Sequence, residues 1–189
     1  MKKIFFPMIA FAMLLLGCEK IKEATSYDFT VNNIRFNFAA IAKEATTLSG
    51  NPVVTTRAGG TTTSFAVTQT VNLSDLGSAD LVKYANKISK VEVNNSTVTV
   101  TANPSDNYTI TDLKIVADGV SGSIEIPSYT IGDDFTEPAG MKTYTSALIK
   151  KLLETGSISV TVTGMSDAPT GTTISISYKS DILFTASLL

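Results

Sequence analysis

Apolar and polar residues alternate with a period of two along most of the chain, which is the pattern of strands with one buried and one solvated face. The clearest run is 65–73, where Phe65, Val67 and Val71 alternate with alanine, threonine and asparagine. The same alternation predicts further strands at about 108–117, 122–127, 157–163 and 172–188.

Two asparagine pairs interrupt this pattern. The apolar phase shifts by one residue between Val31 and Ile34, so the pair at 32–33 is predicted to hold a bulge or a turn. The second pair, at 94–95, separates two alternating runs. Because asparagine tolerates a positive φ, we expect it to turn a hairpin over residues 91–102.

Helical spacing replaces the alternation in two stretches, 78–87 and 144–156. Ser78 is a candidate N-cap for the first stretch and Gly156 a candidate C-terminal stop for the second. We therefore expect two short corner helices, near 79–87 and 145–155. Each helix is followed by a strand, and the weak similarity between the two units leaves open whether the chain contains two related halves.

These elements together predict an all-β fold. Eight to ten mostly antiparallel strands with two corner helices fit a two-layer antiparallel β-sandwich better than a barrel or an α/β fold, and an immunoglobulin-like topology is our first choice. Residues 27–189 are long enough to form this sandwich as a single domain with its own core.

The first 17 residues are predicted to be a signal peptide, because two lysines precede an apolar run that is too short to span a bilayer. The segment Leu15-Leu16-Gly17-Cys18 resembles the lipobox of bacterial lipoproteins. That resemblance implies cleavage between Gly17 and Cys18 and attachment of lipid to the Cys18 thiol. Two or three acyl chains would make the membrane attachment permanent. An ordinary secretory signal followed by an inert cysteine is the alternative.

The chain as a whole, with a lipobox, a tether at 18–26 and a domain rich in threonine, serine and valine, resembles small adhesion lipoproteins of gut Bacteroidetes. This resemblance implies a β-sandwich anchored in the cell envelope, in the outer membrane, with a protein or glycan ligand and no known catalysis. It leaves open which side of that membrane the domain faces.

Composition excludes several classes of function. Residues 1–17 contain two of the 15 basic and none of the 17 acidic residues, so the remaining chain has 13 against 17 and a net charge of −4. A nucleic-acid partner is not expected, because no basic cluster is present to release phosphate counterions. The chain has no histidine and a single cysteine, which rules out histidine-dependent triads and intrachain disulfides. We expect neither enzymatic activity nor a cofactor.

The densest group of carboxylates is Asp133, Asp134 and Glu137. Closely spaced hard oxygens are what calcium requires, so these three residues are the candidate calcium ligands. Their number and spacing do not match a recognised calcium loop, and a solvated turn is the simpler interpretation. No metal site is predicted.

A single arginine, Arg57, lies between small residues ahead of the strand at 65–73. This segment resembles the site at which fimbrillin-type lipoprotein pilins are cut by an arginine-specific protease. The resemblance implies an alternative function, that of a pilin subunit cleaved after Arg57 and assembled by strand exchange.

Overall fold

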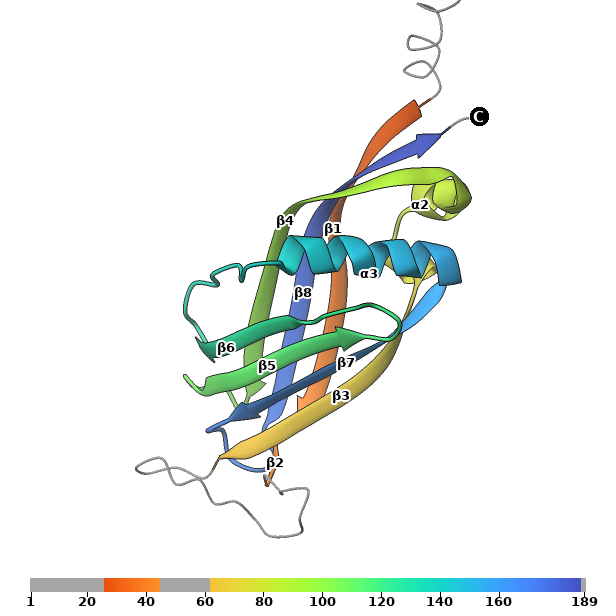
Figure 1. Ribbon diagram of the computed structural model, residues 1–189. Helices are drawn as coiled ribbons and strands as arrows, with labels where there is room; N and C mark the ends of the chain where they lie inside the picture. Colours follow the sequence, from red (N-terminus) through yellow and green to blue (C-terminus); the bar gives the residue numbers. More distant parts are fainter. Residues whose placement is uncertain (1–25, 45–61, 188–189) are drawn as a thin grey trace, which may run out of the picture.

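The computed structural model describes residues 26–44 and 62–187 and arranges their strands in two antiparallel sheets (Figure 1). The first sheet has the order β1-β8-β4, with bounds Ser26–Ile41 (β1), Thr173–Ser187 (β8) and Ile88–Asn103 (β4). The second has the order β2-β3-β7-β5-β6, with bounds Lys43–Glu44 (β2), Thr63–Asn72 (β3), Ser157–Ser166 (β7), Thr109–Ala117 (β5) and Ile124–Thr130 (β6).

Both predicted helices are present. The first is α2 (Ala79–Tyr84), which lies between the 3-10 turns η1 (Leu73–Leu76) and η2 (Ala85–Lys87). Ser78 caps it by accepting a hydrogen bond from the Leu81 N–H over 3.3 Å. The second is α3 (Met141–Thr155), and Gly156 ends it with a φ of 74°.

Helix α3 begins four residues earlier than predicted, because Met141 and Tyr144 are buried and packing stabilises its first turn.

No helix within the two described ranges has the length and apolar character needed to cross a membrane.

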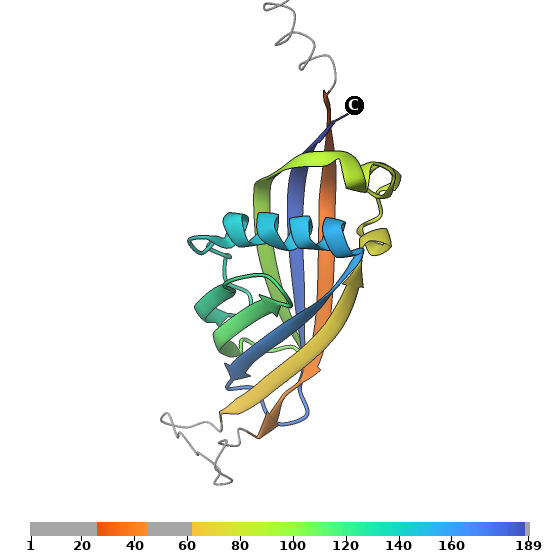
Figure 2. The same ribbon diagram turned by 45° about the vertical axis from the view of Figure 1, so that its right-hand side comes forward.

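The first sheet forms one layer, and α3 and the second sheet lie side by side across its inner face (Figures 1 and 2). The inward phase of β8 is buried along its whole described length, from Ile174 to Ala186. These side chains share one core with the inward residues of both sheets and with the apolar stripe of α3. Burial of this stripe against two sheets is what holds the helix in place.

The all-β, two-layer antiparallel sandwich is therefore confirmed. The sandwich resembles immunoglobulin domains in this two-layer architecture. The strand order differs, because immunoglobulin sheets have the orders A-B-E-D and C-F-G, whereas the sheets here have the orders β1-β8-β4 and β2-β3-β7-β5-β6. Here the first strand pairs with the last over Ser26–Ile41 and Thr173–Ser187.

The bulge predicted at 32–33 is confirmed. The register between β1 and β8 shifts between Val31 and Ile34, and Asn33 has a φ of 60°. The Asn33 N–H donates a hydrogen bond to Asp181 Oδ1 over 2.8 Å. The side chain of a neighbouring strand thus accepts the donor that the bulge leaves out of the ladder.

The predicted hairpin at 91–102 is wrong. Strand β4 runs without a turn from Ile88 to Asn103, and its register to β8 shifts between Val93 and Asn95. The shift falls opposite the same residues of β8 as the shift in β1, because both strands pair with one continuous partner. The second asparagine pair therefore forms a bulge in a long strand.

Candidate functional site

Three of the residues singled out in the sequence, Gly17, Cys18 and Arg57, lie outside the described residues. Cleavage of the signal peptide, lipid attachment and cleavage after Arg57 therefore stay predictions.

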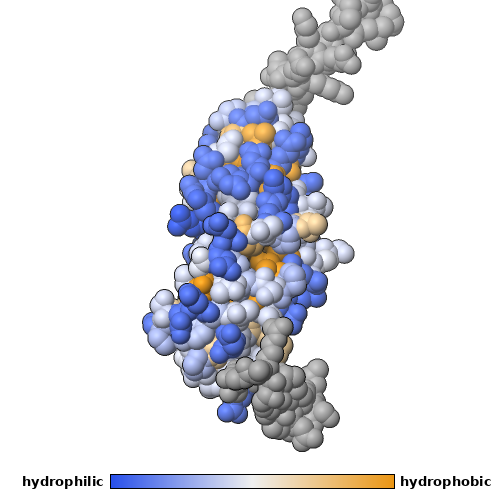
Figure 3. Space-filling model, turned by 90° about the vertical axis from the view of Figure 1, so that its left-hand side faces the viewer, coloured by the Kyte–Doolittle hydropathy of each residue, from blue (hydrophilic) through white to orange (hydrophobic). Residues whose placement is uncertain are grey.

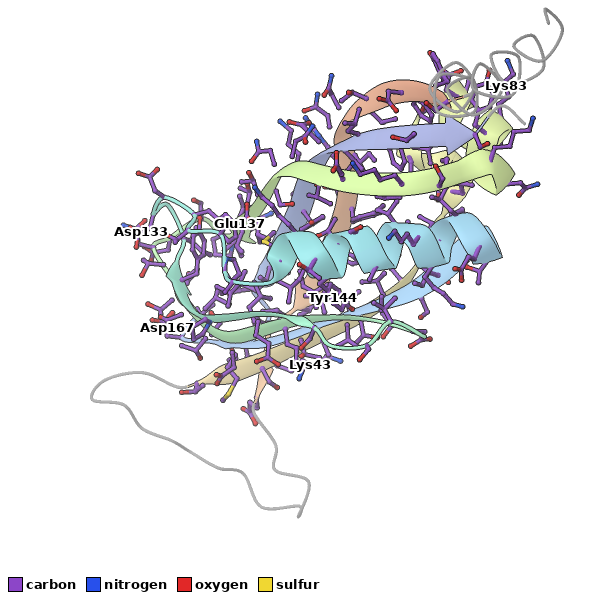
Figure 4. The ribbon with its side chains drawn as sticks, turned by 45° about the horizontal axis from the view of Figure 1, so that its top comes forward. Lys43, Lys83, Asp133, Glu137, Tyr144 and Asp167 are labelled. Atoms are coloured by element: carbon purple, nitrogen blue, oxygen red, sulfur yellow. The ribbon has the colours of Figure 1, made fainter. Side chains whose placement is uncertain are left out.

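The carboxylates Asp133, Asp134 and Glu137 lie in the connection between β6 and α3, and all three are exposed. Figure 4 shows Asp133 at the outer end of this connection and Glu137 closer to the start of α3. Across ranges 26–44 and 62–187, no three His, Cys, Asp or Glu side chains are grouped so that they could hold a metal ion. Whether these carboxylates bind calcium stays a prediction, and the three side chains face solvent.

Hydrogen bonds to the backbone hold the start of this connection, where the Asp133 N–H donates to the Thr130 carbonyl oxygen over 3.0 Å. The Tyr129 hydroxyl donates a hydrogen bond to the Asp133 carbonyl oxygen over 3.0 Å. Partial burial raises the pKa of Tyr129, and the negative charges of Asp133 and Asp134 add to that rise. The phenol therefore keeps its proton at neutral pH and continues to donate this bond.

A buried hydroxyl cluster, which the sequence analysis did not predict, joins α3 to the first sheet. The Tyr178 hydroxyl contacts the Thr145 hydroxyl and lies 3.2 Å from Ser96 Oγ, which is in turn 3.2 Å from Ser180 Oγ. Burial raises the pKa of Tyr178. The four hydroxyls hydrogen-bond one another or backbone carbonyls, so the cluster ties the helix to strands β4 and β8.

A groove of about 950 Å³ lies at the far end of β1, where the two sheets approach each other. We call it the distal groove, and it is lined by Ala39, Ala40, Ile41, Lys43, Ser64, Phe65, Ala66, Asp112, Thr163, Gly164 and Met165. Ile41 is 55% exposed, which is unusual for a large apolar side chain of this molecule. The lining combines small residues with the larger apolar side chains of Ile41, Phe65 and Met165, one cation and one carboxylate.

Glycine is required at one point in the wall of this groove. Phe65 on β3 pairs directly with Gly164 on β7. A Cβ on Gly164 would lie 2.4 Å from Phe65 Cζ, so the ring lies against the bare backbone of the neighbouring strand. An aromatic side chain that covers a cross-strand glycine in this way replaces the packing that the glycine lacks.

The start of β1 and its end, which lines the distal groove, lie at opposite ends of the molecule (Figure 1). β1 contains 16 residues, and a strand of that length spans about 50 Å. Figure 4 shows Lys43, in the groove lining, far from Lys83, which lies towards the other end. The same strand therefore connects the N-terminal end of the domain with the groove.

One face of the molecule is predominantly polar. On the face shown in Figure 3, hydrophilic residues dominate and apolar residues form small separate areas. Such scattered apolar residues are ordinary for a protein surface and indicate no docking site. Among the described surfaces, the distal groove is therefore the candidate ligand site, because it combines a concave shape with an exposed apolar residue and polar groups.

Comparison with known proteins identifies no relatives by sequence, since no family model and no curated protein matches the chain. Solved structures to which the chain is similar include the following two. A decameric BFDV capsid protein is 10% identical, with a TM-score of 0.40, over 84% of this chain and 98% of its own. A Desmodium yellow mottle tymovirus structure is 10% identical, with a TM-score of 0.27, over 86% of this chain and 84% of its own. Similarity at this level supports no inference about function.

Proposed function

We propose that the chain is a lipoprotein of the cell envelope, anchored in the outer membrane through Cys18, whose β-sandwich is a non-enzymatic binding module for a protein or glycan. The observation that carries this proposal is the course of β1, which begins eight residues after the lipobox cysteine and ends at the distal groove. An anchor at one end of this strand directs the groove away from the membrane.

Chain geometry supports this orientation. The segment from Cys18 to Ser26 spans at most about 28 Å when fully extended. β1 then leads about 50 Å further to the groove. A ligand outside the membrane would thus meet the groove before it meets the rest of the domain. The groove lining is suited to an extended ligand, since its small residues allow close approach and Lys43 and Asp112 offer charged contacts at the margin.

A binding role also agrees with the available chemistry. The chain has no histidine. The buried hydroxyl cluster described above consists of hydroxyls that hydrogen-bond one another or backbone carbonyls. A hydrolase would need a general base matched to neutral pH or a pair of carboxylates across a cleft. A hydrolase screen tests this point, and turnover abolished by one Asp or Glu substitution would contradict it.

The groove itself is tested with the purified lipoprotein in mild detergent on a printed array of glycans and extracellular-matrix proteins. Ile41→Asp places a charge in the groove and is expected to abolish the binding that the unmodified protein shows. Thr99→Asp is the control, because it adds the same charge at an exposed position of β4, outside the groove. Equal binding by both variants would contradict the assignment of the groove.

The position of β1 supports a second candidate function, that of a pilin subunit. β1 is an edge strand whose backbone pairs only with β8 in its sheet, and Arg57 lies in the segment between β2 and β3. Cleavage after Arg57 would release β1 and β2 as one piece and expose the edge of β8 to a donor strand from another subunit. Treatment with an arginine-specific protease followed by electron microscopy tests this candidate, which predicts regular filaments.

A further inference from the structure

We infer that the end of the domain where β1 begins carries a membrane-contact surface, formed by Tyr27, Val82, Lys83 and Tyr84, that rests in the headgroup region of the bilayer. This inference depends on the proposed lipid anchor and adds a second, non-covalent contact to it.

The surface is built on a stack of aromatic rings. Phe184 stacks on Phe29 with ring centroids 5.4 Å apart, and Phe29 stacks on Tyr27 at 5.7 Å. Tyr84 of α2 approaches Tyr27 at 5.8 Å. Phe29 and Phe184 are buried in the core, whereas Tyr27 is 41% exposed. The stack thus leads from the core to the surface and ends in a phenol that faces solvent.

Helix α2 contributes the second half of the surface. Leu81 anchors the helix in the core with no exposed area, and the next residue, Val82, is 53% exposed. The ammonium of Lys83 lies 4.8 Å from the centroid of the Tyr84 ring. A hydrogen bond with the Tyr84 hydroxyl raises the pKa of Lys83, so this lysine stays fully charged. An apolar side chain, two phenols and an ammonium group therefore meet at one end of the molecule.

This combination is typical of side chains that occupy a membrane interface. Tyrosine places its ring among the acyl chains and its hydroxyl in water, and lysine extends its charge to the headgroups. Tyr27, Val82 and Ile41 are the exposed large apolar or aromatic side chains of the described ranges. Two of these three thus lie at the end where the chain continues toward Cys18.

The reach of the tether identifies the occupant. Ser26 lies eight residues after Cys18, which confines the start of β1 to within about 28 Å of the bilayer. Positive and negative charges balance at this end, so net charge contributes little to membrane binding; they are Lys83, Lys87 and Lys90 and the acidic residues Asp28, Asp80 and Glu92. Contact should therefore depend on apolar insertion and be nearly as strong on zwitterionic as on anionic vesicles.

The test uses the full-length lipoprotein reconstituted in vesicles of phosphatidylethanolamine and phosphatidylglycerol. Because the native cysteine carries the lipid, Val82→Cys introduces the one free thiol, which is labelled with an environment-sensitive fluorophore. Thr170→Cys is the control, since Thr170 is exposed in the β7-β8 connection, which hydrogen-bonds to Ala42 at the far end of β1.

We expect a blue shift of the label at position 82 and loss of its emission when lipids carrying a nitroxide quencher are included, with no change at position 170. A label at Asn86→Cys should be quenched in the same way, and less so when Val82→Asp is added. Flotation of the vesicles reports the anchor separately.

Two results overturn the inference in distinguishable ways. Protein that floats with the vesicles but shows equal, unquenched emission at positions 82 and 170 refutes the contact surface and leaves the anchor intact. Protein that does not float refutes the anchor, and the contact surface with it.

Discussion

Substitutions in the buried hydroxyl cluster should reveal how α3 is held on the first sheet. Thr145 Oγ1 donates to the Met141 carbonyl oxygen over 2.8 Å, so it must accept the bond from the Tyr178 hydroxyl. Thr145→Val keeps the shape of the side chain and removes this acceptor. A buried donor that loses its acceptor lowers the free energy of unfolding by about 1–3 kcal/mol. Replacing both the donor and the acceptor by apolar groups of the same shape costs much less.

We therefore expect Thr145→Val to lower the free energy of unfolding by about 1–3 kcal/mol and Tyr178→Phe to lower it by about 0.5–1.5 kcal/mol. The double variant should lose about 1 kcal/mol less than the sum, because it removes both partners together. Urea denaturation followed by circular dichroism measures all three values, and the slope of the transition should stay constant.

Thr161→Val is the matched control for this cycle. Thr161 makes a hydroxyl pair of 2.9 Å with Thr68, but the pair is exposed to solvent, so water replaces the lost bond. Its effect should stay within about 0.5 kcal/mol. The reasoning is refuted if Thr145→Val costs no more than Thr161→Val, or if the two cluster substitutions are additive.

Three further predictions concern packing, the first strand and pH. Gly164→Ala should lower the free energy of unfolding by about 1–3 kcal/mol, since its Cβ displaces the Phe65 ring, and Phe65→Leu should restore part of this loss in thermal melts. A fragment of residues 27–189 should unfold cooperatively and run as a monomer in size exclusion. The fragment 58–189 lacks the buried side chains of β1 and should aggregate. Regular filaments of the shorter fragment would instead favour strand exchange. Burial raises the pKa of Tyr178 above its unfolded value, so its contribution to the free energy of unfolding is fully present below pH about 10 and is lost as pH rises through the folded pKa. The free energy of unfolding of Tyr178→Phe should therefore fall less steeply with pH in the alkaline range than that of the unmodified protein. An equally steep fall in both proteins would disprove this.

The sequence was sufficient to predict the strands and the fold class because alternation reports which face of a strand is buried. The long phase in 172–188 is confirmed through Ala186, and the caps at Ser78 and Gly156 act as expected. Local patterns do not identify the partner of a strand, however. The two asparagine pairs are alike in sequence, and continuous pairing with β8 makes bulges of both.

The distal groove could not be assembled from the sequence, because its lining comes from β1, β2, β3, β5 and β7. Two signals pointed to parts of it. Ile41 is apolar at an outward position of its strand, since Phe38 and Ala40 hold the inward phase. Gly164 occupies the inward phase that Val160 and Val162 hold in β7, and a glycine there indicates close approach of another group.

The hydroxyl cluster also had a signal in the sequence. Tyr178 and Ser180 continue the inward phase of β8 between Ile176 and Ile182, and this position in the pattern predicts that both polar side chains are buried. Buried hydroxyls need partners, but the partners come from α3 and β4, which are distant in sequence. The pairing of these elements is a property of the fold alone.

The claim on which the proposed function depends is the lipid on Cys18, and metabolic labelling with an alkyne-bearing fatty acid tests it most directly. The unmodified protein should incorporate the label and sediment with membranes. Cys18→Ser should incorporate none and be lost from the membrane fraction. A Cys18→Ser protein that stays with membranes as completely as the unmodified protein would contradict the account.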